Sequence, residues 1–300
     1  MAARRSVVTT VEEAATLIHD GDTIGIGGFV TTNKPCAIIR ELAKQRRKDL
    51  TIVAAPSSVE VDLLIGLGCV KELITPYMGA EALAPVTPFF GAWAGRRFKV
   101  QEADNGTLIA MLKSRIQRVP FLPVQVVGTS ICDHNEYVSV IDDPFGGPPL
   151  AVARPVKIDV AIIHAMRADK YGNVQHRGAH FLDHLFAMAA DKVVVQVERI
   201  VSNETIRSTA LDTTLPCEFV TAVAEAPHGA HPTASQNFYR LDVEFIKVYV
   251  NASRAYLAGE PDFYNKMMQR FVYEPWTHAE YCEAIGMQRL FGLSLEGSDD

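Results

Sequence analysis

The stretch Asp20-Gly-Asp-Thr-Ile-Gly-Ile-Gly-Gly-Phe-Val-Thr-Thr-Asn-Lys-Pro35 runs from a short apolar segment into paired glycines and then to a proline. Glycine inside a regular element costs about 0.5–1 kcal/mol relative to alanine, so the cluster Gly25, Gly27 and Gly28 indicates tight or closely approached backbone. Because a helix is predicted from about Pro35, the successive N–H groups of this loop could hold an anion or a developing oxyanion. A strand turn without any ligand explains the glycines as well.

The common phosphate and hydrolase motifs are absent from this loop and from the rest of the chain. Gly25-Ile-Gly-Gly-Phe-Val30 does not complete G-x-G-x-x-G, because its last position is valine. No Gly-Lys-Ser/Thr closes a phosphate loop, and the nearest approach to G-x-S-x-G is Gly128-Thr-Ser130. The sequence therefore disfavours a dinucleotide enzyme, a P-loop enzyme and a serine hydrolase.

The composition is that of a soluble globular chain. It has 300 residues, 48% of them hydrophobic, and a formal charge of −6, which argues against a nucleic-acid surface. Its five cysteines form no C-x-x-C, so neither a disulfide framework nor a zinc ribbon is expected. No apolar run approaches the roughly 18 residues of a membrane helix, and no signal peptide is evident. We expect a cytoplasmic protein without membrane or nucleic-acid partners.

Apolar strands alternate with helical segments along most of the chain. Leu50-Thr-Ile-Val-Ala-Ala55 and Ile158-Asp-Val-Ala-Ile-Ile-His164 are the clearest strands. Such alternation predicts an α/β fold with a mainly parallel sheet and helices on both faces. We expect one domain over residues 1–300, an irregular excursion near 132–150 and a helical C-terminal segment at about 242–295.

Polar and glycine-rich segments follow several of the predicted strands. They include Pro56-Ser57-Ser58, Tyr77-Met-Gly79 and Glu102-Ala-Asp-Asn-Gly106. Ligands of parallel sheets bind at the carboxyl ends of the strands. These segments are therefore expected to share one rim with Gly27 and Gly28.

The glycine-rich stretch resembles the N-terminal signature of the family I CoA-transferases. Asp20-Gly21, Ile24, Ile26, the Gly27-Gly28-Phe29 run and Pro35 fit that signature. Gly25 within the apolar run and Asn33 in place of a glycine depart from it. Asparagine tolerates the left-handed backbone region better than most residues, which fits its place in this turn.

Further stretches resemble, in the same order, the alpha-type subunits of this family, and in particular the A-type subunit of the glutaconate CoA-transferases. They are Leu122-Pro123, Asp143-Pro-Phe145, Ile158-Asp-Val-Ala-Ile-Ile-His-Ala165, Ala226-Pro-His-Gly-Ala-His-Pro232, His278-Ala-Glu-Tyr281, Gly286 and Arg289-Leu290. The resemblance covers nearly the whole chain.

The resemblance implies a chain that works with a second polypeptide. Enzymes of this family use a glutamate in a Ser-Glu-Asn-Gly type motif to attack an acyl-CoA thioester, and this chain lacks that motif. Ser202-Asn-Glu-Thr205 has similar letters, but its Ser and Thr are better interpreted as helix caps. In the two-subunit enzymes the glutamate belongs to the B-type CoA-transferase subunit. A heterotetrameric A2B2 assembly, a coenzyme A thioester as substrate and no tightly bound cofactor are therefore implied.

The resemblance also implies the site. Gly27, Gly28 and Phe29 would line it, and Asn105 and Gly106 would join them. The polar end of the acid would meet four further side chains, Ser57, Ser58, Tyr77 and Glu81. Glu81 stands where the resembling stretch has serine, and its carboxylate would repel a dicarboxylic acid. Glu102 at a strand end is either a solvated carboxylate or an acid or base aimed towards the partner polypeptide.

Metal binding and a reactive thiol are the two alternative chemistries. His176, His180 and His184 have the i, i+4, i+8 spacing of one helix face and could bind zinc or nickel. Gly178 disfavours a helix there, and no fourth ligand is suitably spaced. No metal is therefore predicted. Cys36 at a helix start is either a low-pKa thiol or a small buried hydrophobic residue.

Two alternative functions also remain open. The same fold could serve an acyl-CoA ring hydrolase or decarboxylase, as in steroid and branched-chain acyl-CoA catabolism. A non-catalytic CoA-binding regulatory protein is the third hypothesis.

Overall fold

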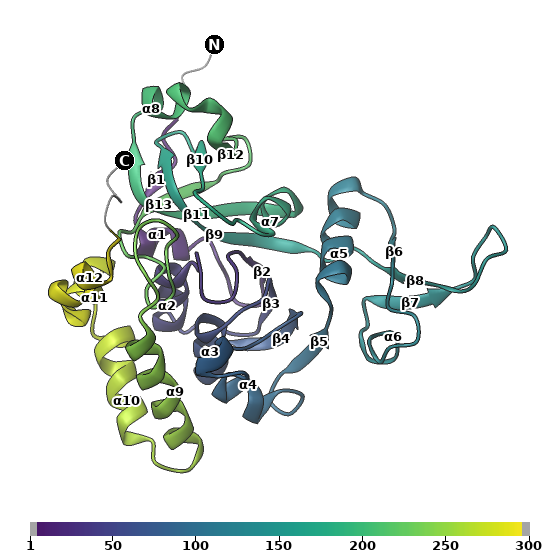
Figure 1. Cartoon of the computed structure of the whole chain (residues 1–300), viewed down its shortest axis with the longest axis horizontal. Helices are drawn as coiled ribbons and strands as arrows, with labels where there is room; N and C mark the ends of the chain where they lie inside the picture. Colours follow the sequence, from purple (N-terminus) through teal and green to yellow (C-terminus); the bar gives the residue numbers. More distant parts are fainter. Residues whose placement is uncertain (1–4, 296–300) are drawn as a thin grey trace.

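The computed structural model describes residues 5–295. A large sheet runs through the protein in the strand order β1-β13-β11-β9-β2-β3-β4-β5, and every neighbouring pair along this path is parallel (Figure 1). These strands are β1 Val8–Thr9, β2 Thr23–Ile26, β3 Leu50–Ala54, β4 Val70–Thr75, β5 Lys99–Glu102, β9 Ile158–Asp169, β11 Ala190–Val201 and β13 Ala222–Glu225. Two short strands, β10 Val174–Gln175 and β12 Thr213–Leu215, join the sheet in antiparallel fashion beside β9.

Both faces of this sheet are buried around its central strands, which is why β2, β3 and the first half of β9 are mostly apolar. On β9, Val160 and Ile162 point into one hydrophobic core, whereas Ala161 and Ile163 point into the other. This alternation is the two-residue period of a strand. The prediction of a parallel sheet covered on both faces is confirmed.

Different helices cover the two faces. The first core includes residues of α1 Val11–Ala15, α2 Cys36–Lys44, α3 Val59–Gly66, α4 Pro88–Trp93, α9 Val243–Leu257 and α10 Asp262–Met268. The second core is formed with α5 Asn105–Gln117 and α7 Asp183–Ala189. Shorter helical segments are η1 Glu81–Leu83, α8 Asn203–Ser208 and η2 Ala210–Asp212.

A second, three-stranded antiparallel sheet projects from the body beyond α5 (Figure 1). It consists of β6 Leu122–Val124, β7 Val138–Ile141 and β8 Leu150–Ala153, with α6 Ile131–His134 before β7. The irregular excursion expected near 132–150 thus contains the end of α6, the strand β7 and the start of β8, with irregular segments between them. The turn residues at 142–149 are the loop of a hairpin, and its flanking strands are too short to give a clear alternating pattern.

The C-terminal part is helical, as predicted. After α9 and α10 it continues as η3 Gln269–Tyr273, α11 His278–Ile285 and α12 Met287–Leu293. Asp242 caps α9 by accepting the N–H of Phe245 at 2.9 Å. In Figure 1 these helices lie together on the side of the sheet opposite the projecting arm.

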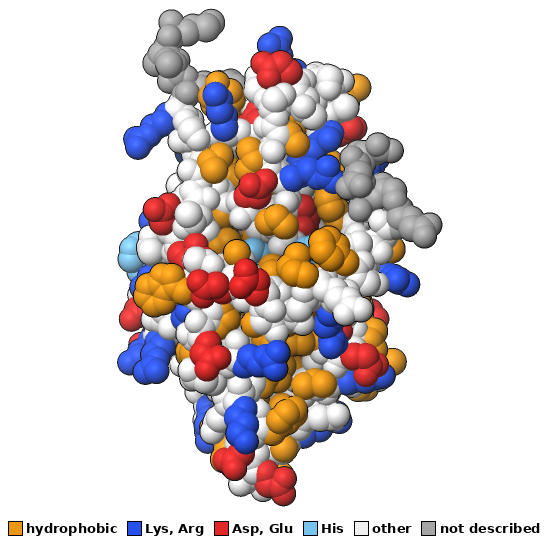
Figure 2. Space-filling view, turned by 90° about the vertical axis from the view of Figure 1, so that its left-hand side faces the viewer, with side chains coloured by type: hydrophobic (Ala, Val, Ile, Leu, Met, Phe, Trp, Pro, Cys, Tyr) orange, Lys and Arg blue, Asp and Glu red, His pale blue; other side chains and the backbone are white. Residues whose placement is uncertain are grey.

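The face that carries these C-terminal helices has a mixed surface. Acidic and basic side chains are interspersed there, with hydrophobic side chains gathered between them (Figure 2). On this face no continuous basic patch forms that would suit a phosphate backbone. Within residues 5–295, no helix has both the length and the apolar character to cross a bilayer.

Asp62 of α3 is a fully buried carboxyl group. Its oxygens accept the N–H of Phe90 at 2.9 Å and the hydroxyl of Tyr249 at 3.0 Å. Burial raises its pKa to about 6, although these hydrogen bonds act in the opposite direction. The folded protein therefore holds this proton more tightly than the unfolded chain does.

This raised pKa predicts a loss of stability as the pH rises. The contribution of the bound proton is complete below the ordinary pKa of 3.8 and is lost as the pH rises through about 6. Replacing Asp62 with Asn removes this titration, so only the wild type should lose this stability as the pH rises. The difference in the free energy of unfolding, Asp62→Asn minus wild type, should therefore increase by about 2–3 kcal/mol between pH 4 and pH 7. Urea titrations at each pH measure the difference. A difference that stays constant would contradict the burial argument.

Candidate functional site

The loops that follow β2, β3 and β4 are joined by backbone hydrogen bonds at one edge of the sheet. Val30 N–H donates to the carbonyl oxygen of Pro56 at 2.7 Å. Ser57 N–H donates to the carbonyl oxygen of Tyr77, and Gly79 N–H donates to that of Ser57, each at 3.0 Å. The structure thus brings three of the predicted site segments together at the carboxyl ends of neighbouring strands.

The N–H groups of residues 27–30 in the glycine-rich loop are engaged within the protein. Gly27 N–H donates to the carbonyl oxygen of Ile162 at 3.0 Å, and Gly28 N–H donates to Oδ1 of Asp183 at 2.8 Å. Phe29 N–H donates to the carbonyl oxygen of Thr32 at 2.9 Å, and Val30 is bonded as described above. The expectation that this N–H run holds an anion is therefore wrong for this arrangement. Three of these four donors bond to other segments, namely Ile162 of β9, Asp183 of α7 and Pro56, and only that of Phe29 bonds within the loop.

Glycine is required at positions 27 and 28 for steric reasons. Gly28 has φ +77°, and a Cβ there would lie 2.4 Å from the carbonyl oxygen of Asn33. A Cβ on Gly27 would lie 2.5 Å from Oδ1 of Asp183. Asn33 itself has φ +53°, the left-handed conformation that asparagine tolerates. The two glycines are thus explained by close packing around the loop.

A buried lysine, which the sequence reasoning did not identify, lies against this loop. The Lys34 side chain is fully buried, and its Nζ lies 3.2 Å from the Gly27 carbonyl oxygen, 3.1 Å from Ser57 Oγ and 3.4 Å from Glu60 Oε1. Glu60 is buried too, and both its oxygens accept the N–H of Ser58. The available signal was a lysine directly before Pro35, and two carboxylates, Glu60 and Asp62, within a helix whose other residues are apolar or glycine.

The remaining predicted site residues differ in exposure. Ser57 and Ser58 are fully buried, and Ser58 Oγ has no hydrogen-bond partner. Tyr77 is half-buried, whereas Glu81, Glu102, Asn105 and Gly106 are exposed. Glu81 has φ +51° at the start of η1, and Glu102 ends β5 in register with Thr75. Asn105 and Gly106 form the first turn of α5, which Asp104 caps.

Phe29 is the most prominent side chain that the glycine loop exposes at this edge. It is 40% exposed, and its ring meets that of Phe181 edge to face with the centroids 5.0 Å apart. The loop therefore offers an aromatic surface at the rim.

The three histidines do not share a helix, because α7 begins only at Asp183. Their rings nevertheless form a row, with centroids 5.4 Å apart for His176 and His180 and 5.9 Å apart for His180 and His184. His176 is buried, with Nδ1 2.6 Å from Thr214 Oγ1 and Nε2 3.3 Å from Oδ2 of Asp183. The second distance fits an ion pair but not a well-directed hydrogen bond, since neither atom has a hydrogen-bond partner. In the part of the chain that the structure describes, no group of three or more His, Cys, Asp or Glu is arranged to hold a metal ion.

His176 and His180 line an open hollow of about 640 Å³. Arg167 and Arg177 also line it, so its surface is rich in basic groups. The hollow adjoins the loop that carries Phe181.

A buried hydrogen-bond network lies at the ends of β9 and β11. His164 Nε2 is 3.0 Å from Ser235 Oγ and 3.1 Å from Glu198 Oε1, and Glu198 also accepts the hydroxyl of Tyr239 at 2.8 Å. Burial acts to raise the pKa of Glu198, but the hydrogen bonds from His164 and Tyr239 hold it below its usual value. The network holds the segment 226–236 against the sheet. In the sequence it was indicated only by His164, the histidine that ends the apolar run at 158–164.

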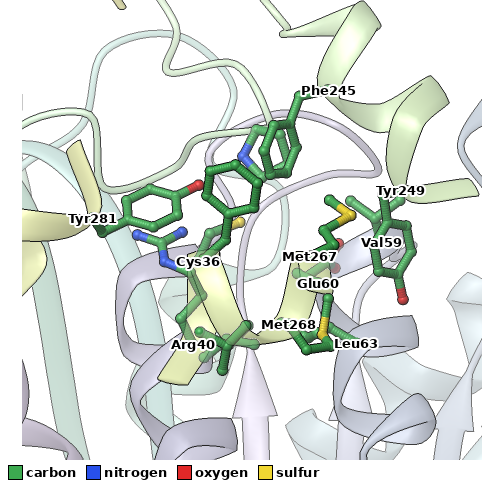
Figure 3. A pocket seen from close by; sticks show the side chains of 14 residues that line it. Cys36, Arg40, Val59, Glu60, Leu63, Phe245, Tyr249, Met267, Met268 and Tyr281 are labelled. Carbon is green, nitrogen blue, oxygen red and sulfur yellow. The ribbon is translucent and has the colours of Figure 1, made fainter. Parts of the chain in front are cut away.

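An apolar cavity of about 50 Å³ lies between α2, α3 and the C-terminal helices. Figure 3 shows Cys36, Glu60, Met267 and Met268 around it. This volume holds only a few water molecules, so the cavity is too small for an acyl chain with its thioester. Burial and the charge of Glu60 raise the pKa of the Cys36 thiol to about 12. Cys36 is therefore a buried apolar residue, and the alternative of a reactive low-pKa thiol is wrong.

Comparison with known proteins finds relatives that align along nearly the whole chain. The A-type subunit of a glutaconate CoA-transferase from Acidaminococcus fermentans is 32% identical over 96% of this chain and 94% of its own length. A crystal structure of glutaconate coenzyme A-transferase from that organism matches with a TM-score of 0.91 at 31% identity, covering 97% of this chain and 96% of the matched chain.

Other relatives carry different activities in their names. A cholesterol ring-cleaving hydrolase subunit of Rhodococcus jostii is 28% identical over 91% of this chain and 99% of its own length. A crystal structure of the decarboxylase AibA/AibB matches with a TM-score of 0.74 at 26% identity, covering 88% of this chain and 100% of the matched chain.

The family model described as coenzyme A transferase matches residues 8–226, which contain the glycine loop and every strand of the large parallel sheet. This result and the relatives that align along the whole chain agree with the fold and with the resemblance in the sequence. The chain therefore belongs to the coenzyme A transferase family, as a subunit of the A type.

Proposed function

We propose that this chain is the A-type component of a two-subunit CoA-transferase that moves CoA between an acyl-CoA and a carboxylic acid. The observation that carries the proposal is its likeness, over 96% of its length, to the A-type subunit of a glutaconate CoA-transferase, although it lacks the family's glutamate nucleophile motif. A chain that keeps the fold and lacks the nucleophile fits a division of the site between two polypeptides. The partner in this proposal is a B-type subunit, in an A2B2 assembly.

The proposed reaction needs one glutamate from the partner. Its carboxylate attacks the thioester carbonyl and expels the CoA thiolate, which leaves a mixed anhydride. The thiolate then attacks the glutamyl carbonyl, releasing the first carboxylic acid and forming a glutamyl-CoA thioester. The second acid attacks this thioester and reverses the sequence. This chain contributes the wall of the site through Phe29, Tyr77 and the loops around them.

The rim disfavours a dicarboxylic acid as acceptor. Glu81 and Glu102 are both exposed, in segments that follow or end neighbouring strands β4 and β5, and in this proposal they face the acid and repel a second carboxylate on it. We therefore propose a monocarboxylic acid as acceptor, in place of glutaconate itself.

A second candidate keeps the division between two polypeptides and changes the reaction. The likeness to a subunit of a ring-cleaving hydrolase and to a decarboxylase favours hydrolysis or decarboxylation of an acyl-CoA. Glu102 would then be an acid or base at the end of β5. A non-catalytic CoA-binding protein is a third candidate, and it would bind CoA as a monomer without a partner.

Purification of the native complex tests the proposal. The chain carrying an affinity tag should bring down one second polypeptide, and the complex should transfer CoA from acetyl-CoA to short monocarboxylic acids. The chain alone should give no transfer. Transfer by the single chain would refute the division of the site. A partner without glutamate at the nucleophile position, in a complex that instead hydrolyses or decarboxylates acyl-CoA, would favour the second candidate.

A further inference from the structure

The peptide group between Gly27 and Gly28 is held at both ends by buried ions. Its carbonyl oxygen, on Gly27, lies 3.2 Å from Nζ of Lys34. Its N–H, on Gly28, donates to Oδ1 of Asp183 at 2.8 Å. The side chains of Lys34 and Asp183 are both fully buried. The positive ion faces the negative end of the peptide dipole, and the negative ion faces its positive end.

Each ion has a further partner on its outer side. Glu60 lies 3.4 Å from Lys34, and His176 lies 3.3 Å from Asp183. Hydrogen bonds to ionised groups are roughly twice as strong as those between neutral groups, and burial strengthens them further. The peptide group thus links two charged clusters. One joins Lys34, in the loop before α2, to Glu60 of α3, and the other joins Asp183 of α7 to His176, directly after β10.

We infer that Lys34 and Asp183 are positioning residues that hold the Gly27–Gly28 peptide group and thereby set the place of Phe29. Phe29 follows directly and stays 40% exposed against Phe181. Because the N–H groups from 27 to 30 are engaged, the loop meets a substrate with this aromatic pair. On the proposed function, this loop contacts the apolar part of the acyl group. The clamp, by which we mean Lys34 and Asp183 on the two sides of the Gly27–Gly28 peptide group, then sets the preference for acyl-chain length.

A purely structural role for these ions is the competing explanation. Loss of folded protein lowers the rate for every substrate by one common factor. Displacement of Phe29 instead changes the ratio of kcat/KM between a longer and a shorter acyl-CoA, because only the longer chain reaches the aromatic pair. This ratio therefore separates the two roles.

Two variants loosen the clamp from opposite sides. Asp183→Asn keeps the shape of the side chain and removes its charge. The double variant Lys34→Met with Glu60→Gln removes both charges of the other cluster, so that no buried ion is left alone and folding is retained. The matched control is Asp159→Asn, since Asp159 accepts the N–H of Thr23 at 2.9 Å at the opposite end of β2.

Two measurements test the inference. Hydrogen exchange of residues 27–30 in the full chain should accelerate at least about tenfold in both clamp variants and stay unchanged in Asp159→Asn. In the complex with its partner, the ratio of kcat/KM for hexanoyl-CoA over acetyl-CoA should fall at least about tenfold, as for a misplaced contact. Phe29→Ala should lower the same ratio. Unchanged exchange would overturn the clamp, and faster exchange with an unchanged ratio would overturn its role in acyl preference. If the complex has no transferase activity at all, the exchange result still tests the clamp and the proposed function fails separately.

Discussion

Replacing Gly28 with Ala should destabilise the protein by about 2–5 kcal/mol. The left-handed backbone of Gly28 costs an alanine about 1–2 kcal/mol, and forcing a methyl group into a filled space adds about 1–3 kcal/mol. Here the space is filled by the carbonyl oxygen of Asn33, 2.4 Å from the Cβ position, and backbone atoms cannot move aside as a side chain can. The shift of the urea unfolding midpoint measures the loss.

Gly21→Ala is the matched control for this variant. Gly21 has a similar φ of +82°, but no atom lies within 4 Å of its Cβ position. It should therefore show only the backbone cost of about 1–2 kcal/mol. Equal losses in the two variants would mean that packing around Gly28 contributes nothing and that only its turn conformation matters.

Replacing Asp242 with Ala should cost about 3–5 kcal/mol. Asp242 accepts two hydrogen bonds from Arg289, each of 2.6 Å, one from the N–H of Phe245 and one at 3.0 Å from Nε2 of His231. Burial acts to raise its pKa, but these donors hold the pKa far below its usual value. Without the carboxylate, α12, the cap of α9 and the buried His231 lose their common partner. The free energy of unfolding from urea titration is the readout.

Asp104→Ala isolates the capping part of this effect. Asp104 caps α5 by accepting the N–H of Thr107 at 2.7 Å, and it lies exposed at the surface. Loss of such a cap costs about 1 kcal/mol. A loss in Asp242→Ala no larger than in Asp104→Ala would show that the hydrogen bonds to Arg289 and His231 add no net stability.

Much of the fold can be predicted from local pattern. The largely apolar sequences of β3 and of the first half of β9 indicate strands buried on both faces, and segments between the predicted strands have helical periodicity. The projecting sheet could not be predicted in the same way. Its strands have at most four residues, and the turn-forming residues at 142–149 dominate the local composition.

The site could be predicted only in part, because it depends on distant pairings. Gly27 and Gly28 are recognisable from the sequence, but Asp183, which excludes a side chain at Gly27 and accepts the N–H of Gly28, lies 155 residues beyond Gly28. The position of Lys34 directly before Pro35 marks this lysine, but its pairing with Glu60 of another element cannot be derived from the local sequence. The three histidines show the limit of spacing as a signal, since Gly178 disfavours a helix through them and only His184 lies in one.

The strand order has a consequence for how the chain folds during its synthesis. The strands β2, β3, β4 and β5 lie within the first 102 residues and pair with one another, but the free side of β2 pairs with β9, which begins at Ile158. Until the ribosome has released β9, that edge of the sheet has unpaired N–H and C=O groups along an apolar strand, the kind of edge that recruits other strands. Closure is later still for β1, whose partner β13 contains Val223. The newly made protein therefore depends on the second half of its own chain to cover the sheet that its first half has already formed.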